Sequence, residues 1–328
     1  MSIAVPLYGF GGSGGGSGGT LTVTAPANVT VTVSKDGKTK TKNSGTSGVV
    51  VFKGLASGTW TVTITGDDKT AKKSVVIITD YSTAISFSTI PEFTYTGDFE
   101  IVNDSDEPIS VSQDNWKIRF LTSGTLIFTN LNGAEGGIDV FLVGGGAGGN
   151  YGYRGGAGGG SGYTRTTQAV TVRVGVQYDI VIGAGGAGAK TSGGRAGGVT
   201  SAFGSSANGG ATLSDNGVYG GDGGSGGGSG TLNQDKDGAY SKAGIGGTDG
   251  ANGQGTHPGT GQGTTTREFG EPSGTLYATG GKGAAANNIT PDPVSQNTGD
   301  GGNGAGGSIE STAGGSGIAI IRNTRGAA

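Results

Sequence analysis

The chain has 328 residues, of which 77 are glycine, 8 are proline and 14% are charged. Collagen is excluded because it needs glycine at every third position and abundant proline. Long helices are excluded because each interior glycine costs about 1 kcal/mol relative to alanine. The formal charge of −3 predicts no overall basic field for nucleic acid or anionic lipid, so the composition indicates an all-β protein with a separate use for glycine.

Cysteine is absent and His257 is the single histidine, which excludes disulfides, thiolate metal sites and multi-histidine metal sites within one chain. We expect no membrane span, because no stretch of 18 apolar residues occurs. The first ten residues lack a basic segment followed by a continuous apolar run, so we expect no export by the secretory route.

Glycine density divides the chain into three parts. Residues 1–19 hold eight glycines, residues 20–88 hold six, residues 89–143 hold five, and residues 144–328 hold 58. We therefore predict an N-terminal peptide with a Gly/Ser linker over 1–19, an ordinary β domain over 20–88, and a glycine-rich β domain over 89–328.

The N-terminal peptide is apolar ahead of its linker. Such a segment cannot fold alone, but it can dock on a partner as an added strand; the alternative is a disordered start. The candidate anchor residues are Ile3, Val5, Leu7, Tyr8 and Phe10.

Residues 20–88 alternate apolar and polar side chains over several short segments, which predicts a small β-sandwich. Trp60, Val62 and Ile64 are expected to share one buried face, and Asp36-Gly37 is a hairpin signal. Phe52-Lys-Gly-Leu55 followed by Gly58-Thr-Trp-Thr-Val62 resembles the carboxypeptidase-regulatory or PEGA-like sandwich family. That resemblance implies a spacer.

Further strands are predicted on either side of the glycine runs. The segments are 116–120, 125–128, 138–143, 170–174, 178–182 and 318–322. Their recurrence argues against a flexible tail, because a tail does not return repeatedly to alternating β-branched sequence.

Five glycine runs lie at 144–162, 183–198, 209–230, 247–263 and 299–317. One interpretation is flexible loops, since glycine loses the most backbone freedom on ordering. The other is a bundle of extended helices with three residues per turn, whose backbone groups bond to neighbouring segments because no Cβ keeps them apart. We favour the bundle, since strands frame each run.

Six segments in series resemble the glycine-rich domain of bacteriophage tail fibres and adhesins. They are Phe93–Gly97, Trp116–Leu126, Val140–Gly146, Gly158–Tyr163, Tyr178–Gly186 and Gly314–Arg322. The resemblance implies a jelly-roll-like sandwich with polyglycine helices in a virion protein that attaches to a host. Expected partners are other virion proteins, through the N-terminus, and a host surface glycan or protein. It implies assembly in the host cytoplasm and exposure on the particle surface; oligomeric state is left open.

Two motifs suggest nucleotide binding but lack their context. Gly183–Gly188 has the form G-x-G-x-x-G after a strand, and Gly185–Thr191 resembles a phosphate loop. Both need a helix to follow, and the sequence that follows is too glycine-rich for one. We therefore expect neither a cofactor nor a nucleic-acid partner.

Candidate receptor contacts interrupt the glycine runs. Tyr151, Tyr153 and Arg154 are of types enriched at interfaces, with packing against the sandwich as the alternative, and His257 lies in a glycine-rich loop. The acidic residues of the second half, Glu268 and Glu271 among them, show no spacing that would indicate the two paired carboxylates of glycoside cleavage.

We predict a non-enzymatic tail fibre or tail-tip adhesin. The alternatives are a capsid fibre or decoration protein, a bacterial surface adhesin, and a capsule depolymerase.

Overall fold

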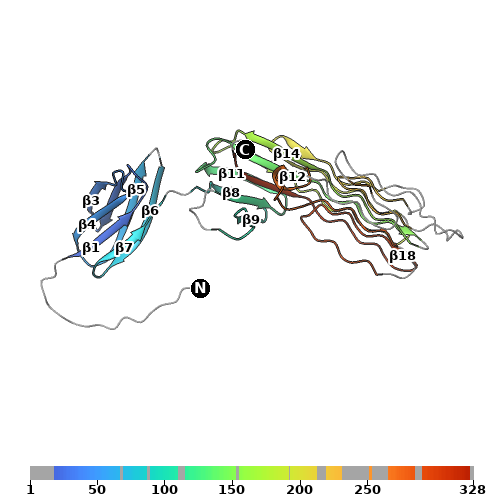
Figure 1. Cartoon of the computed structure of the whole chain (residues 1–328), viewed down its shortest axis with the longest axis horizontal. Coiled ribbons are helices and arrows are strands. Elements are labelled where there is room, and N and C mark those ends of the chain that lie inside the picture. The colour runs from blue at the N-terminus through green and yellow to red at the C-terminus, as the bar shows by residue number, and fades with distance from the viewer. Residues whose placement is uncertain are drawn as a thin grey trace. The chain divides into compact units, whose positions relative to one another are not determined.

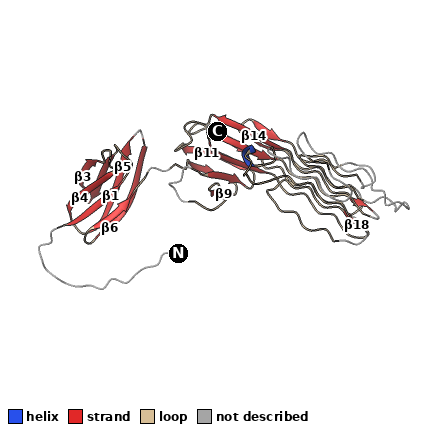
Figure 2. Cartoon of the chain, in the orientation of Figure 1, coloured by secondary structure: helices blue, strands red, loops and turns tan. Residues whose placement is uncertain are grey.

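The computed structural model describes most of the chain, in two compact units, Met1–Ser88 and Thr89–Ala328, here called the N-terminal unit and the glycine-rich unit. Both units are built from β-strands (Figures 1 and 2). Within the described ranges the helical structure is one 3₁₀ turn, η1 (Glu268–Gly270), and no helix has the length and hydropathy to cross a membrane. The described residues are 18–66, 69–86, 89–109, 115–152, 155–191, 193–212, 219–230, 251–252, 265–284 and 290–325.

The N-terminal unit is a sandwich of two small sheets. Its strands are β1 (Gly19–Thr24), β2 (Thr30–Lys35), β3 (Lys38–Asn43), β4 (Val49–Leu55), β5 (Gly58–Gly66), β6 (Lys69–Ile77) and β7 (Tyr81–Ala84). One sheet has the order β4-β1-β7 and the other β3-β2-β5-β6. All pairs are antiparallel except β1 with β7.

Alternation in the sequence accounts for this sandwich. Trp60, Val62 and Ile64 on β5 are all buried in the core between the sheets, which confirms the predicted face. Asp36 and Gly37 form the two-residue connection between β2 and β3 and both have positive φ, 48° and 76°. Positive φ at both positions is the geometry of the turn that matches the twist of a hairpin.

The glycine-rich unit contains a five-stranded sheet, β14-β12-β19-β10-β9, and a three-stranded sheet, β15-β11-β8. Two short ladders, β13–β18 and β16–β17, complete it. The strands are β8 (Glu92–Tyr95), β9 (Phe99–Val102), β10 (Lys117–Phe120), β11 (Gly124–Asn130), β12 (Ile138–Val143), β13 (Tyr151–Gly152), β14 (Thr164–Val170), β15 (Gln177–Ile180), β16 (Thr200–Ala202), β17 (Ser205–Ala207), β18 (Ala305–Gly306) and β19 (Ile318–Asn323).

Both faces of the five-stranded sheet are covered. On β12, Val140 and Leu142 belong to the main core, while Phe141 and Val143 face a second cluster with Phe269 from the segment 265–284. Every residue of β12 is buried. A strand buried on both faces is apolar along nearly its whole length, and Ile138–Val143 fits this pattern with Asp139 as its one charged residue.

One predicted strand was misplaced. Alternating valines predicted a strand over 170–174, but β14 runs over Thr164–Val170 and ends where that segment begins. β14 is an edge strand that pairs with β12 on one side only, and most of its side chains are polar. Because an edge strand does not need an apolar face of its own, periodicity gave no signal for it.

The glycine runs form a bundle of extended segments. The first run, Gly144 to Asn150, donates its backbone N–H groups to three neighbours in strict rotation, so that every third residue bonds to the same one. The donor–acceptor pairs are Gly144–Tyr163, Ala147–Gly160 and Asn150–Ala157 for the first neighbour, Gly145–Gly198 and Gly148–Arg195 for the second, and Gly146–Gly315 and Gly149–Thr312 for the third. This is the signature of an extended helix with three residues per turn.

The carbonyl groups of the same run accept from three further segments. Gly145 accepts from Gly210, Gly146 from Gly186, Ala147 from Gly302 and Asn150 from Ala305. The run is therefore surrounded by six segments. The antiparallel run 157–163 has the same three-residue rotation, with donors Gly158 and Ser161 to Gly228 and Ser225, Gly159 and Gly162 to Gly302 and Gly299, and Gly160 and Tyr163 to Ala211 and Asn208.

The glycine segments lie so close together that most positions have no room for a side chain. A Cβ placed on Gly146 would lie 1.9 Å from the carbonyl oxygen of Asp300, and one on Gly162 would lie 1.9 Å from that of Gly144. Non-bonded atoms cannot approach so closely. The bundle interpretation of the glycine runs is confirmed for the described residues; most of the predicted run 247–263 lies outside them.

Candidate functional site

The first candidate site lies where the glycine segments turn back, at the end of the bundle away from the sheets. There β13 and β18 form a short parallel ladder, with Tyr151 opposite Ala305 (Figure 1). Tyr151 is half-buried, and its hydroxyl donates to the carbonyl oxygen of Gly307 at 2.7 Å. The tyrosine interrupts the glycine sequence because it stands at the connection between the antiparallel runs 144–150 and 157–163.

Asn150 fixes the segments at this end of the bundle. It is fully buried, and its Oδ1 accepts the N–H of Gly194 at 2.8 Å while its Nδ2 donates to the carbonyl of Tyr219 at 3.4 Å. Because the side chain bonds to two segments and the backbone to two more, four segments meet at one residue. Sequence reasoning missed Asn150; the available signal was an amide side chain inside an otherwise side-chain-free run.

Ser311 performs a similar task nearby. Its hydroxyl donates to the carbonyl of Gly149 at 2.6 Å and accepts the N–H of Ala189 at 2.7 Å. These bonds offset the cost of removing the buried hydroxyl from water. Two polar side chains, Asn150 and Ser311, therefore join glycine segments at this end of the bundle.

The other candidate contacts lie outside the described residues. These are Tyr153, Arg154 and His257 among the receptor-contact candidates, and Ile3, Val5, Leu7, Tyr8 and Phe10 among the anchor candidates. Tyr151 is the one member of the predicted set that the structure describes.

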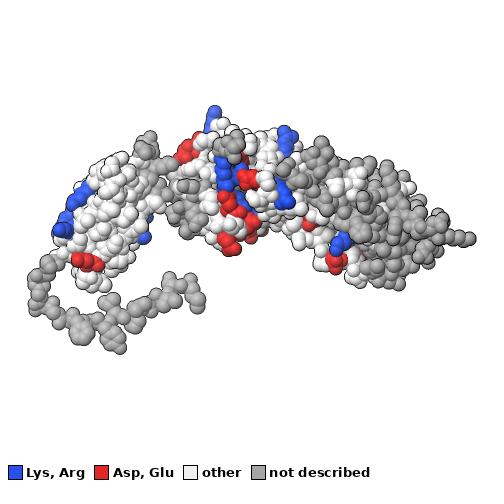
Figure 3. Space-filling model, viewed as in Figure 1, with Lys and Arg blue, Asp and Glu red and all other residues white. Residues whose placement is uncertain are grey.

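A second site, which sequence reasoning did not find, is an ion-pair cluster between the five-stranded sheet and the segment 265–284. Its members are Asp106, Lys117, Arg119, Asp139, Glu268, Glu271 and Arg322. The strands place Lys117, Arg322 and Asp139 side by side across β10, β19 and β12. Figure 3 shows acidic and basic side chains gathered together on the glycine-rich unit.

The cluster pairs each of its buried charges. Lys117 Nζ lies 2.6 Å from Glu268 Oε1 and 2.7 Å from Asp106 Oδ1, and Arg119 Nη2 lies 2.5 Å from the same Asp106 oxygen. Glu268 Oε1 is not aligned for a hydrogen bond despite that short distance, so we regard the contact as an ion pair. Burying such charges is tolerable because each has an opposite charge beside it.

Arg322 completes the cluster. Its guanidinium contacts Glu271 Oε1 at 2.6 Å and Asp139 Oδ2 at 3.3 Å, and it lies over the ring of Phe269 at 4.1 Å from the centroid. A narrow cleft of about 150 Å³ borders the cluster. Sequence reasoning found no partners for Glu268 and Glu271, because the basic residues that they contact, Lys117 and Arg322, lie on strands far away in the sequence.

Protonation in the cluster follows from its geometry. Burial alone would raise the pKa of Asp106, but bonds from Lys117 and Arg119 outweigh it and hold that pKa below the ordinary value. Burial, reinforced by the charge of Glu268, raises the pKa of Tyr277. These shifts favour the charged form of Asp106 and the neutral form of Tyr277, which suits the ion pairs between the sheet and the segment 265–284.

Neither a metal site nor a phosphate-binding loop is formed by the described residues. In the described part of the chain, no three His, Asp or Glu side chains gather closely enough to hold a metal ion. The G-x-G-x-x-G sequence lies inside the bundle, where Gly186 donates its N–H to the carbonyl of Gly146 at 2.8 Å. That amide is engaged by backbone and does not point at a phosphate site.

Comparison with known proteins assigns a family to the glycine-rich unit. No curated protein matches the chain. The family described as Glycine-rich domain matches residues 121–324, which is more than half of the chain and includes the bundle, β11 to β19 and the ion-pair cluster segment 265–284. The chain belongs to the glycine-rich domain family.

Proposed function

We propose that the protein is a structural and adhesive virion component, a phage tail fibre or tail-tip adhesin that contacts the host surface. The observation that supports this most is the three-residue rotation of hydrogen bonds in the glycine bundle. Such a bundle fixes every interior segment by its backbone, so the connections at its end are free to vary in sequence without changing the frame.

Receptor contact belongs at those connections in this proposal. By sequence, Tyr151, Tyr153 and Arg154 lie between the runs 144–150 and 157–163, and His257 lies within the predicted run 247–263. Tyrosine and arginine offer large contact areas at low entropic cost, which suits recognition of a host glycan or protein. The Tyr151 hydroxyl is used within the chain, so its ring is the part that would contact a receptor.

The remaining parts have supporting roles. The N-terminal unit serves as a spacer, in keeping with its resemblance to carboxypeptidase-regulatory and PEGA-like sandwiches. The apolar peptide with Ile3, Val5 and Leu7 attaches the chain to other virion proteins. No catalytic step is part of the proposal.

A competition experiment tests attachment. Purified full-length protein, added in excess to host cells, is expected to reduce adsorption of particles that carry the same protein. The double variant Tyr153→Ala with Arg154→Ala should lose this competition. The control Arg173→Ala, an exposed arginine between β14 and β15, should retain it. Unimpaired adsorption in the presence of wild-type protein would contradict an adhesive role.

Location within the particle separates the remaining alternatives. Immunogold labelling is expected to mark the tail; label on the capsid would assign a capsid fibre or decoration protein, and label on uninfected bacteria a surface adhesin. Deleting residues 2–10 should abolish incorporation into particles while the purified variant still folds. Unchanged incorporation would remove the anchor role.

A further inference from the structure

The N-terminal unit carries a lysine-rich seam where its two sheets meet along one side. We define the seam as the adjoining edge strands β3 and β4. Lys40 and Lys42 of β3 stand opposite Val33 and Val31 of β2, whose side chains are buried in the core. Cross-strand partners share a face of the sheet, so both lysines start from the core-facing side of β3.

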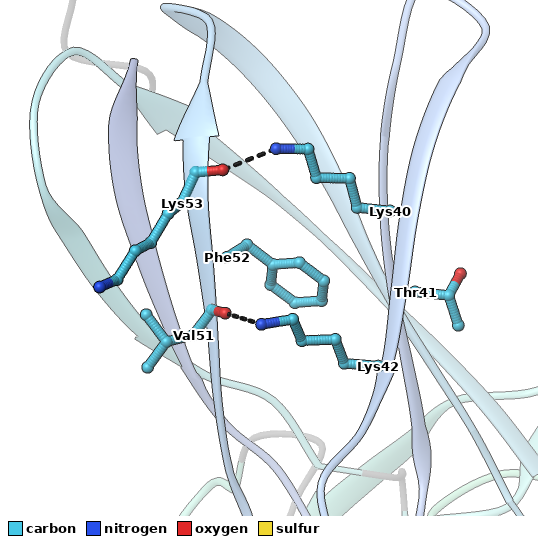
Figure 4. Close-up of a pocket in the computed structure, with 6 residues that line it drawn as sticks. All are labelled: Lys40, Thr41, Lys42, Val51, Phe52 and Lys53. Atoms are coloured by element: carbon cyan, nitrogen blue, oxygen red, sulfur yellow. Dashed lines mark hydrogen bonds between the residues drawn. The ribbon is translucent and has the colours of Figure 1, made fainter. Parts of the chain in front are cut away.

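Each of these lysines crosses to the other sheet. Lys40 Nζ donates to the carbonyl of Lys53 at 2.6 Å, and Lys42 Nζ donates to the carbonyl of Val51 at 2.7 Å (Figure 4). The Lys42 ammonium also lies 5.7 Å from the centre of the Phe52 ring. Inward-pointing charges of this kind prevent edge strands from pairing with other chains.

The charges at the seam are not neutralised by these contacts. A carbonyl is a neutral acceptor, and an ammonium has three donors. Lys40 also donates to the carbonyl of Gly54 at 3.4 Å, so each lysine keeps its charge and at least one donor for a further partner. The groove between the strands has a volume of about 540 Å³, and its lining residues include no acid. They are Lys40, Thr41, Lys42, Val51, Phe52 and Lys53.

The N-terminal unit is positively charged although the chain as a whole has a formal charge of −3. Residues 1–88 contain eight lysines and four aspartates, a formal charge of +4, whereas residues 89–328 contain 13 basic and 20 acidic residues, a formal charge of −7. Figure 3 shows lysines along one side of the N-terminal unit. Local fields of this kind raise the concentration of oppositely charged ligands near a surface.

We propose that the seam binds an anionic polysaccharide, a chain of sugars that bear carboxylate, phosphate or sulfate groups. Lys38, Lys40 and Lys42 alternate along β3, which spaces them by about 7 Å, so a row of charges lies along the seam at regular intervals. A repeating polymer matches such a row better than a single ion. Phe52 is buried and offers no ring for stacking a base or a neutral sugar. This role goes beyond the spacer proposed above and does not depend on it.

Binding to defined polymers tests the site. Full-length protein is expected to bind immobilised polygalacturonate and dextran sulfate at low salt, to release at high salt, and not to bind neutral dextran. The double variant Lys38→Gln with Lys53→Gln should weaken binding about fivefold. These two side chains are exposed and neither makes the cross-sheet bonds described for Lys40 and Lys42, so the fold is expected to survive.

A matched control distinguishes a site from a diffuse field. Lys72→Gln with Lys73→Gln removes the same charge from β6, an edge strand on the opposite side of the unit, and should weaken binding by less than twofold. Lys73 Nζ donates to the carbonyl of Ala84 at 3.0 Å, so the unfolding of this variant is measured alongside its binding. Equal losses in the two double variants would overturn the seam as a site. Absence of binding to both anionic polymers, or tighter binding to duplex DNA than to either, would overturn the polysaccharide assignment.

Discussion

At the scale of single residues, the bundle depends on glycine having no Cβ atom. Gly146 lies where three segments meet, with the carbonyl oxygens of Asp300 and Gly299 at 1.9 and 2.8 Å from where its Cβ would be. The obstructing atoms are backbone, which cannot rotate away as a flexible side chain can. One methyl group would therefore separate segments and break bonds on both sides.

We expect Gly146→Ala to lower the free energy of unfolding of the glycine-rich unit by at least about 2 kcal/mol, because overpacking forces backbone shifts in a dense interior. Denaturant unfolding of the full chain measures this. The matched control is Gly136→Ala, since no atom lies within 4 Å of a Cβ at that exposed position. A change at Gly146 as small as that at Gly136 would contradict close packing of the segments.

At the scale of elements, the segment 265–284 is attached to the sheet by apolar contacts and ion pairs together. Phe269 and Tyr277 pack against Phe141 at centroid distances of 5.9 and 5.6 Å. Asp106 supports the same attachment, because it binds Lys117 and its Oδ2 accepts the hydroxyl of Thr275 at 3.1 Å. The strength with which the segment 265–284 is attached to the sheet is therefore expected to depend on pH.

We expect Asp106→Asn to reduce the free energy of unfolding by about 1 kcal/mol at neutral pH, a modest value because Asp106 is partly exposed. Its pKa is lowered in the fold, so its stabilisation is present above the unfolded pKa of about 3.9 and is lost as pH falls through the lower folded pKa. Asparagine suits the positive φ of this residue, 64°, so charge is the main change.

The measurement is unfolding of wild type and variant at neutral pH and at pH near 3. The difference between them should shrink at the acidic value. Asp292→Asn is the control, because the Asp292–Lys282 pair is exposed, with 79% and 63% of the side chains accessible, and is expected to contribute nothing measurable. A pH-independent difference for Asp106→Asn would refute an ionic contribution.

At the scale of the molecule, the glycine-rich unit joins two kinds of order. The sheets are held by buried apolar side chains, whereas the bundle is held by backbone hydrogen bonds among segments with few side chains. Both kinds protect amides from solvent. The second kind leaves little apolar surface to bury, so its stability rests on the bonds being satisfied on all sides.

We expect slow amide exchange across residues 144–149 and 158–163, comparable with that of β12, because each of these N–H groups is bonded inside the bundle. Hydrogen–deuterium exchange with mass spectrometry of the full chain makes the comparison. The exposed residues Lys190 and Thr191 provide the internal reference for faster exchange. Exchange of both glycine runs as fast as this reference would show that they do not form a stable bundle.

Local signals predicted the elements well where side chains alternate. Asp36-Gly37 predicted its hairpin, and Trp60, Val62 and Ile64 predicted one buried face, because both signals act within a few residues. The edge strand β14 was not predicted, because its mostly polar residues show no alternation of apolar and polar side chains. The ion-pair cluster was not predicted either, because only the packing of segments distant in sequence brings Lys117 and Glu268 together.

The sequence by itself determined that the chain is all-β, that it has two compositions, and that its glycine runs suit extended packed segments. Only the tertiary structure decided which runs are neighbours and in which register. The physical reason is that a glycine segment has no side chain with which to specify a partner. Neighbours are chosen instead by the strands that frame the runs and by a few polar residues, such as Asn150 and Ser311, whose side chains bond across segments.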